Sequence, residues 1–151
     1  MNAEGKLIEV MHGVNLDMLG QRDPEIYGTL TLPQLQEEIS RFAAEFDLEI
    51  GFFQSNHEGE FVERLHQLRD SADAIVLNPG AWTHYSWAIR DALEIASLPA
   101  CEVHLSNIKS REPWRSTSVI EDLCLESFVG HGPGGYKMAL ERLSDELGRG
   151  S

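Results

Sequence analysis

Cationic side chains are scarce in this chain of 151 residues. Lysine and arginine together number 12 against 25 aspartates and glutamates, so the formal net charge is −13. A chain of that charge repels nucleic acid and anionic lipid on average, and no basic stripe offsets the repulsion. We therefore expect neither a nucleic-acid partner nor a membrane partner. An anionic small ligand would need a local positive pocket, which directs attention to Arg22, Arg111 and Arg115.

Cysteine and long apolar runs are scarce as well. Cys101 and Cys124 are the only cysteines, and they lie in apolar runs without metal-ligand or redox spacing. We interpret them as reduced core thiols, as is usual for a cytoplasmic protein. No segment approaches the ~18 apolar residues that cross a membrane, and the amino-terminal apolar run is too short for a signal peptide. The sequence thus predicts a soluble cytoplasmic chain.

Common signatures of cofactor and metal sites are missing. The glycine-rich segment Gly130–Gly135 lacks the Lys-Ser/Thr pair of a phosphate-binding loop, and no GxGxxG follows the first apolar run. The histidines form no HxxxH or HxH pattern. These absences disfavour nucleotide binding and predict no metal site.

Short apolar runs alternate with helical stripes along the chain. Alternation of this kind is typical of an α/β fold with a parallel sheet covered by helices on both faces, and ligands then bind at the carboxyl ends of the strands. The length suits a single α/β domain, 1–147, with a disordered tail, 148–151. We expect strands at 6–11, 48–53, 73–78, 100–105 and 127–129, helices over 31–46, 61–68, 89–96 and 136–147, and a basic helical turn at 110–115.

The segment Met11–Gly28 follows the first expected strand and is too long and polar for a simple connection. It carries an amide, a guanidinium and a phenol in Asn15, Arg22 and Tyr27. Long loops with glycine hinges are commonly lids over active sites. An arginine close to a tyrosine on such a lid suggests a tyrosine that acts as a base.

Two further polar clusters follow later strands. Asn78-Pro-Gly-Ala-Trp-Thr-His84 closes the third strand, where Asn78 and His84 supply donors and acceptors, although a plain strand-to-helix turn would also use these residues. After the fourth strand, period-two alternation puts Glu102, His104 and Ser106 on one side. A carboxylate beside a histidine suits a general acid, while a structural buried pair is the alternative.

Backbone and guanidinium groups next to this second cluster are suited to bind a carboxylate. The N–H groups of Leu105 and Ser106 could form an anion nest. Arg111 and Arg115 are four residues apart and would share one face of a helix, ready for bidentate contact with a carboxylate. Salt bridges on the surface of this acidic chain are the alternative use of both arginines.

Taken together, these clusters resemble the type II 3-dehydroquinate dehydratases. The resemblance spans nearly the whole chain in the order and spacing of that family, with departures such as Val14 for the usual proline and Asp23 for glutamate. The matching blocks are His12-Gly-Val-Asn-Leu-Asp-Met-Leu-Gly20 with Arg22-Asp-Pro24 and Tyr27-Gly28; Phe53-Gln-Ser-Asn-His-Glu-Gly59; Asn78-Pro-Gly80 with Thr83-His84 and Arg90-Asp-Ala92; Glu102-Val-His-Leu-Ser-Asn107 with Arg111-Glu-Pro113 and Arg115; and Gly130-His-Gly132 with Gly135-Tyr136.

The resemblance implies a flavodoxin-like three-layer sandwich with a five-stranded parallel sheet in the order 2-1-3-4-5. It also implies trans-elimination of water from 3-dehydroquinate to give 3-dehydroshikimate through an enolate, without a metal or organic cofactor. By the same resemblance, Tyr27 would remove the proton and Asn15 would stabilise the enolate oxygen. His104, oriented by Glu102, would protonate the departing hydroxyl.

The family further implies how the substrate is held and how subunits assemble. Asp91 is expected to reach the site of a neighbouring subunit, within trimers that form a dodecamer. The substrate hydroxyls and carboxylate would be bound by Asn78, His84, Leu105, Ser106 and Arg115.

Elementary electrostatics is consistent with a tyrosine base. Bringing a tyrosine pKa from ~10 to about 7–8 requires roughly 3–4 kcal/mol. One guanidinium at ~4 Å is worth about 4 kcal/mol at an effective dielectric of 20. Arg22 is thus roughly sufficient if the lid closes it onto Tyr27. A Schiff base would need a desolvated lysine amine in an apolar setting within these blocks. The only lysines are Lys6, Lys109 and Lys137, and none of them meets this condition, so a Schiff base is disfavoured.

Two other classes of function compete with this enzyme. A non-catalytic binding module on a flavodoxin-like sheet would carry a phosphate loop or an acidic metal cluster, and neither is present. A family member that has lost catalysis and acts in binding or assembly is the second alternative, which the intact Arg22, Tyr27, Asn78 and His104 disfavour. Biosynthesis of aromatic precursors and quinate breakdown share the same step, and the sequence leaves both open.

Overall fold

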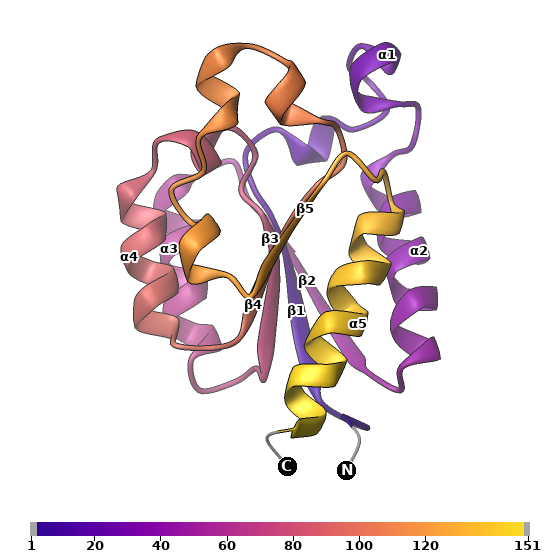
Figure 1. Cartoon of the computed structure of the whole chain (residues 1–151), viewed down its shortest axis with the longest axis vertical. Helices are drawn as coiled ribbons and strands as arrows, with labels where there is room; N and C mark the ends of the chain where they lie inside the picture. Colours follow the sequence, from indigo (N-terminus) through magenta and orange to yellow (C-terminus); the bar gives the residue numbers. More distant parts are fainter. Residues whose placement is uncertain (1–2, 150–151) are drawn as a thin grey trace.

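Five parallel strands form the centre of the molecule (Figure 1). The computed structural model describes residues 3–149, apart from the side chain of Tyr27. The strands lie in the order β2-β1-β3-β4-β5, as predicted. Their bounds are β1 Leu7–His12, β2 Glu49–Gln54, β3 Ala74–Asn78, β4 Ala100–His104 and β5 Glu126–Val129.

Helices cover both faces of this sheet, which confirms the predicted three-layer α/β sandwich of flavodoxin type. In Figure 1, α2 (Leu32–Glu45) and α5 (Gly134–Arg149) lie on one side of the strands, and α3 (Glu58–Leu68) and α4 (Trp87–Ala96) lie on the other. Two apolar cores result, one on each face. Alternate residues of the inner strands enter opposite cores: on β3, Val76 packs in the first and Ile75 and Leu77 in the second.

The local sequence accounts for the start of α2. Thr31 accepts a hydrogen bond from the Gln34 N–H at 3.3 Å, and Gln34 returns one by accepting from the Thr31 N–H at 3.0 Å. This capping box satisfies two backbone donors at the helix N-terminus. Leu35 and Ile39 then bury completely against the sheet, as their helical spacing predicted.

The segment expected to form one basic helical turn at 110–115 differs from the prediction. It forms two separate 3-10 turns, η3 (Ile108–Ser110) and η4 (Pro113–Ser116). Glu112, between them, is extended, with φ −58° and ψ 145°. The reason is Pro113, since a residue before proline is driven out of the helical region. Arg111 and Arg115 therefore do not share one helical face.

The carboxyl terminus also departs from the prediction. Helix α5 continues through Gly148 and Arg149, so the first half of the expected disordered tail is helical. The preceding turn stabilises this extension, because Leu147 packs against the core shared by α2, α5 and the sheet. The last part of the expected tail, 150–151, lies outside the described residues.

No helix within residues 3–149 combines the length and the apolar character that a membrane crossing requires. Cys101 is buried and Cys124 is half-buried, and both are free thiols. Burial raises the pKa of Cys101 to about 12 and also raises the pKa of Cys124. Both thiols therefore stay protonated near neutral pH and pack as small apolar groups.

An unusual polar group lies at the end of β1. The His12 imidazole is fully buried, with its ring stacked on Phe52 at 6.1 Å between centroids and tilted against Tyr136 at 6.4 Å. Neither ring nitrogen has a hydrogen-bond partner among the described residues. Burial lowers the pKa of His12 from 6.5 to about 4, so the ring is neutral in the folded protein at neutral pH.

We predict that His12 makes the fold acid-sensitive. Below pH 6.5 the unfolded chain protonates this imidazole while the folded chain does not until about pH 4, so stability is lost as pH falls through that interval. The unfolding free energy of a His12→Phe variant is compared with that of wild type at two pH values. When the pH falls from 7.5 to 5.0, this difference should shift by about 2 kcal/mol in favour of the variant. Urea unfolding at both pH values measures this. A His66→Gln control removes an exposed imidazole and should change nothing; an equal response of the two variants would contradict the assignment.

Candidate active site

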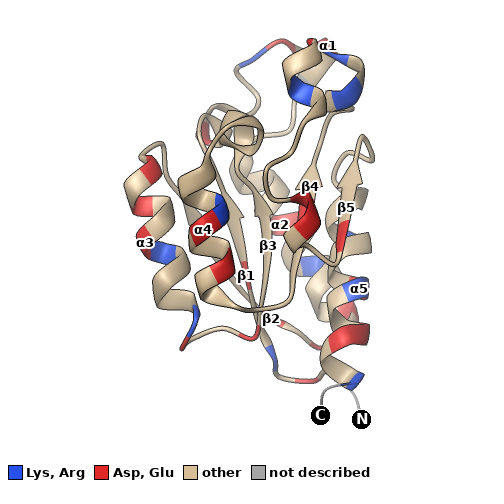
Figure 2. Ribbon diagram, turned by 60° about the vertical axis from the view of Figure 1, so that its left-hand side comes forward, with Lys and Arg blue, Asp and Glu red and all other residues tan. Residues whose placement is uncertain are grey.

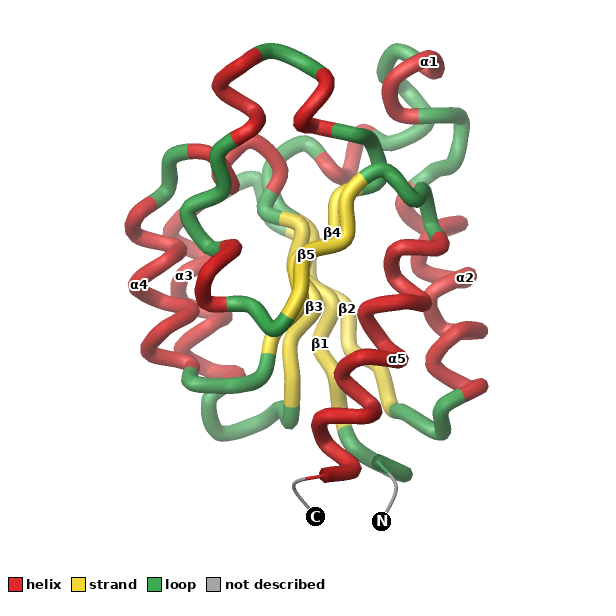
Figure 3. The backbone as a smooth tube through the Cα atoms, viewed as in Figure 1, coloured by secondary structure: helices red, strands yellow, loops and turns green. Residues whose placement is uncertain are grey.

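A cavity of about 110 Å³ lies at the carboxyl ends of the strands. Loops gather at this edge of the sheet (Figure 3). Arg111 and the apolar side chains Leu16, Leu19 and Ile108 line part of the cavity wall. The cavity brings together eight of the predicted site residues, namely Asn15, Arg22, Asn78, His84, His104, Leu105, Ser106 and Arg115.

Three other predicted residues lie elsewhere. Glu102 lies behind His104 and is 1% exposed. Asp91 is on the exposed face of α4 and does not line the cavity of this single chain. Tyr27 ends a short helix, α1 (Pro24–Tyr27), in the expected lid segment, but its side chain lies outside the described residues.

Parallel pairing of neighbouring strands brings the site loops together. His12 pairs with Asn78, so the loops after β1 and β3 leave the sheet side by side. The Gly13 N–H donates to the Asn78 carbonyl at 2.8 Å. A side chain cannot fit at this contact, because a Cβ on Gly13 would lie 2.1 Å from the Pro79 carbonyl oxygen. Glycine is thus required where the two loops touch.

Asn15 is held in an uncommon backbone conformation, with φ 69°. Its N–H donates to Oδ1 of Asn56 at 2.8 Å. Asn56 is itself fixed, because its Nδ2 donates to Asp17 at 3.2 Å and its Oδ1 also accepts from Gln54 at 3.1 Å. The polar block after β2 therefore supports the loop that presents Asn15 to the cavity.

Asn78 ends β3 and is 5% exposed. Its Oδ1 accepts a hydrogen bond from the Gly80 N–H at 3.1 Å, which fixes the amide plane and leaves Nδ2 as the donor. Gly80 has φ +69°, a conformation that side chains disfavour. The buried Tyr136 ring lies behind Asn78, and burial raises the pKa of its phenol while the contact with Asn78 lowers it.

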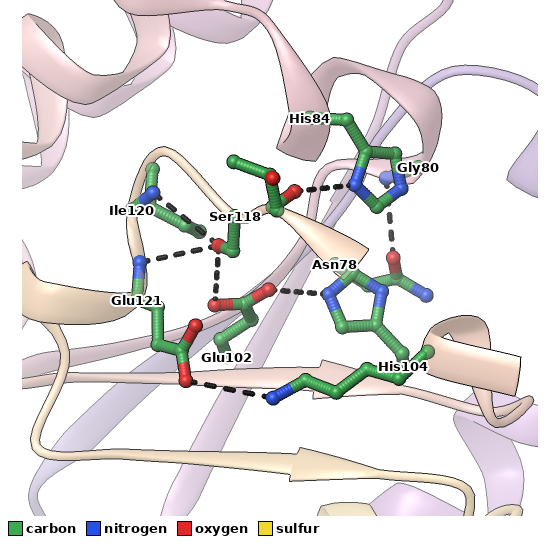
Figure 4. Close-up of polar contacts among 10 residues, drawn as sticks. Asn78, Gly80, His84, Glu102, His104, Ser118, Ile120 and Glu121 are labelled. Carbon is green, nitrogen blue, oxygen red and sulfur yellow. Dashed lines mark hydrogen bonds and ion pairs between the residues drawn. The ribbon is translucent and has the colours of Figure 1, made fainter. Parts of the chain in front are cut away.

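His104 and Glu102 form a buried pair on one side of β4, as the strand alternation predicted. His104 Nε2 lies 2.5 Å from Glu102 Oε2, and both residues are almost completely buried (Figure 4). A carboxylate only accepts, so Nε2 carries a proton and Nδ1 is the remaining nitrogen for cavity chemistry. A histidine held in this way has the geometry of a general acid or base.

His84 lies beside this pair, with its ring stacked on His104 at 6.4 Å between centroids. Its Nδ1 contacts the Thr117 carbonyl at 2.7 Å (Figure 4). Because a carbonyl only accepts, Nδ1 carries the proton and Nε2 can accept from a ligand hydroxyl. Burial is the main cause that lowers the pKa of His84, so the ring stays neutral at neutral pH.

Two carbonyl contacts orient the backbone after β4. The His104 carbonyl accepts from the Gly130 N–H at 3.2 Å, and the Leu105 carbonyl accepts from the Gly132 N–H at 3.1 Å. In a trans peptide the N–H points opposite to its carbonyl. The next two N–H groups, those of Leu105 and Ser106, therefore both point away from the Gly130–Gly132 segment. Paired N–H groups of this kind bind anionic oxygens.

Cationic side chains gather around this cavity despite the acidic composition. Figure 2 shows blue segments in the loops beyond the carboxyl ends of the strands, while red is spread over the helices. Arg22, Arg111 and Arg115 all line the cavity. Arg115 is paired with Glu112 and stacks on the Trp114 ring at 4.2 Å from its centroid. The cavity therefore favours an anionic ligand.

Some contributors to the site were missed by sequence reasoning. Ser118 donates a hydrogen bond to Glu102 at 2.9 Å, and its hydroxyl carried no sequence signal because the contact spans 16 residues. Asn56 belongs to one of the blocks that match the family, but its contact with the Asn15 loop could not be predicted from that match. In the part of the chain that the structure describes, no three His, Cys, Asp or Glu residues form a group that could hold a metal ion.

Comparison with known proteins decides the family. The model of the family described as dehydroquinase class II matches residues 6–144. This chain belongs to the class II dehydroquinases. It is 50% identical over 134 residues to the 3-dehydroquinate dehydratase of Leptothrix cholodnii, covering 88% of this chain and 90% of that protein. The enzyme of the same name from Pelobacter propionicus is 48% identical over 146 residues, 96% of this chain and 98% of that protein.

A solved member of the class II dehydroquinases has the same fold. The crystal structure of type II dehydroquinase from Propionibacterium acnes superimposes with a TM-score of 0.89 at 38% sequence identity. The match covers 94% of this chain and 98% of that one. This dehydroquinase family member therefore shares its fold with a solved type II dehydroquinase.

We predict that Gly13 is essential to the geometry of the site. A Gly13→Ala variant places a methyl group against backbone atoms of Pro79, so it should lose about 3 kcal/mol of unfolding free energy and separate the loops that carry Asn15 and Asn78. Gly59→Ala is the matched control, because a Cβ there meets nothing within 4 Å in α3 and should be neutral or stabilising by up to about 1 kcal/mol. Urea unfolding compares them. Equal stabilities would show that the loop contact is not tight.

Proposed function

We propose that this chain is a 3-dehydroquinate dehydratase, a hydro-lyase that converts 3-dehydroquinate to 3-dehydroshikimate. The observation that carries the proposal is the His104–Glu102 pair, separated by 2.5 Å, at the wall of a cavity in a class II dehydroquinase chain. The reaction is an elimination that needs a proton acceptor, a proton donor and a group to stabilise an enolate. We propose Tyr27, His104 and Asn15 for these three roles, without a metal or organic cofactor.

His104 is the proposed general acid. In the elimination it protonates the departing hydroxyl, which then leaves as water. The adjacent Glu102 carboxylate accepts from Nε2 and fixes the orientation of the ring. Burial supports the role, because few water molecules compete for the proton at a side chain that is 4% exposed.

Tyr27 is the proposed base, and Arg22 is the cation that favours its phenolate form. The phenolate removes a proton from the carbon next to the ketone, and the resulting enolate collapses to the conjugated enone as the hydroxyl departs. Asn15, whose backbone is anchored by Asn56, is proposed to stabilise the enolate oxygen through a water molecule. The lid position of α1 supports this assignment, since a base on a lid closes over a bound substrate.

The remaining cavity groups are proposed to hold the substrate. Its carboxylate fits the N–H groups of Leu105 and Ser106, whose orientation is fixed by the carbonyl contacts to Gly130 and Gly132. Arg115 adds charge near the same ligand. The substrate hydroxyls are proposed to contact Asn78 and His84, which offer a donor and an acceptor respectively.

Homo-oligomerisation into trimers and then a dodecamer is part of the proposal. Asp91, proposed to complete the site of a neighbouring subunit, lies on the outward face of α4 between Trp87, which is 65% exposed, and Ile95, which is 48% exposed. Tyr85, just before this helix, is 57% exposed. Large apolar side chains gathered on one exposed face are typical of a subunit contact.

A cytoplasmic location is also proposed, and the two free thiols support it because a reducing compartment keeps cysteines unpaired. The step itself serves either aromatic biosynthesis in the shikimate pathway or quinate breakdown. Growth on quinate of a strain with and without this chain separates these two uses.

A spectrophotometric assay tests the proposed function. Purified protein mixed with 3-dehydroquinate should produce an ultraviolet absorbance rise from the conjugated enone product. Turnover should survive borohydride treatment in the presence of substrate, because no lysine Schiff base forms in the proposed mechanism. Absence of turnover in a correctly assembled oligomer would favour the alternative of a family member that acts in binding or assembly. Inactivation by borohydride would contradict the mechanism.

We predict that Tyr27→Phe lowers kcat by about 10²–10⁴-fold, since this variant removes the proposed base. Arg22→Ala should lower kcat through the loss of the cation. The matched control is Tyr85→Phe, which changes an exposed tyrosine that does not line the cavity of this chain. Circular dichroism should show an intact fold in all three variants. Near-normal turnover in Tyr27→Phe would contradict the assignment of the base.

We predict that the site is shared between subunits. His104→Ala and Asp91→Ala should each be nearly inactive alone. Mixed oligomers formed by refolding the two together should regain activity, because a site with its own His104 can receive Asp91 from the other variant. The ratio of recovered activity to that of the separate variants is the measurement. A mixture that stays as inactive as its components, despite hybrid oligomers in native mass spectrometry, would contradict a site shared between subunits.

A further inference from the structure

The Glu102 carboxylate uses both of its oxygens within the protein. Oε2 contacts His104 Nε2 at 2.5 Å, and Oε1 accepts a hydrogen bond from the Ser118 hydroxyl at 2.9 Å (Figure 4). Glu102 is 1% exposed, so bulk water does not reach the carboxylate to replace a lost donor. Its orientation toward His104 therefore depends on the Ser118 contact.

Ser118 is itself held firmly. Its hydroxyl oxygen accepts from the Ile120 N–H at 3.3 Å and the Glu121 N–H at 3.2 Å, so the hydroxyl hydrogen is directed to Glu102. Figure 4 shows these contacts converging on Ser118. The two backbone N–H groups also place positive dipole ends behind the hydroxyl, which makes it a better donor to a carboxylate.

The chain on either side of Ser118 is anchored to the helical layer beneath it. The Thr117 carbonyl contacts His84 at 2.7 Å, the Val119 N–H donates to the Thr83 carbonyl at 2.8 Å, and the Val119 carbonyl accepts from Arg90 at 2.8 Å. Arg90 is further paired with Asp122. Residues 117–122 thus form an anchored segment that holds the Ser118 hydroxyl against Glu102.

We propose that Ser118 is a positioning residue of the dehydratase site, which fixes the Glu102 carboxylate so that His104 presents Nδ1 to the departing hydroxyl. The inference rests on the proposed function for its catalytic consequence. Ser118 does not line the cavity, so it acts through Glu102 rather than on the substrate. A substitution should therefore change the chemical step and leave substrate binding almost unaffected.

The titratable groups around the pair do not replace the contact that Ser118 makes. His84 stacks on His104 and is coupled electrostatically to Glu102 and Arg115, and the protonated Cys124 thiol lies near Glu102. Among these groups only the Ser118 hydroxyl donates to Oε1 of the carboxylate in the described structure. Without it, Oε1 is left buried without a donor, and the carboxylate is expected to rotate away from its present plane.

Three variants test the role of Ser118. Ser118→Ala should lower kcat about tenfold or more and change KM less than twofold. Ser118→Thr keeps the hydroxyl and should recover most of kcat. Ser116→Ala is the matched control, since its exposed hydroxyl donates to the Pro113 carbonyl at 2.7 Å in the same segment, and its kinetics should match wild type. A normal kcat in Ser118→Ala, or a loss carried entirely by KM, would overturn the proposal.

A second readout does not depend on turnover. Crystal structures of Ser118→Ala and Ser116→Ala should show the Glu102 carboxylate and the His104 ring turned in the first variant only. An unchanged Glu102–His104 contact in Ser118→Ala would overturn the positioning role even if the assay failed. If wild type does not dehydrate 3-dehydroquinate but the carboxylate turns, the proposed function fails while the positioning of the pair stands.

Discussion

The register of the central parallel strands is the constraint on which the site depends. Because β1, β3 and β4 run side by side and end at the same edge, three short polar segments far apart in sequence leave the sheet together. The loops after β1 and β3 then touch backbone to backbone, at a glycine that tolerates no side chain. The position of the cavity is therefore a consequence of strand order.

The cavity differs in charge from the rest of this acidic protein. The chain carries a net charge of −13, yet three arginines from the segments after β1 and β4 line the cavity together with backbone N–H groups. One carboxylate, Glu102, lies behind the cavity and is matched by His104 on one oxygen and Ser118 on the other. The arrangement combines attraction for an anionic substrate with a proton donor held in a fixed orientation.

Much of the fold could be predicted because it depends on local patterns. Alternation of apolar runs and helical stripes predicted the strands, and the family resemblance implied their order, as confirmed. Period-two alternation put Glu102 and His104 on one side of β4, where the structure has them. The prediction of one helical turn at 110–115 was wrong, because Pro113 excludes the helical conformation at Glu112. The contact of Ser118 with Glu102 could not be predicted from the sequence, because it depends on tertiary packing. The catalytic roles stay predictions.

We propose that the acid at the sheet edge and the base on the lid act on opposite faces of the substrate, so the stereochemical course of the reaction tests the central claim most directly. 3-Dehydroquinate carrying one deuterium at the carbon next to the ketone, on the face opposite to the departing hydroxyl, is converted and the product is examined by mass spectrometry. The account predicts loss of the deuterium. Its retention, with loss of the hydrogen on the same face as the hydroxyl, would contradict a two-sided site formed by His104 and Tyr27.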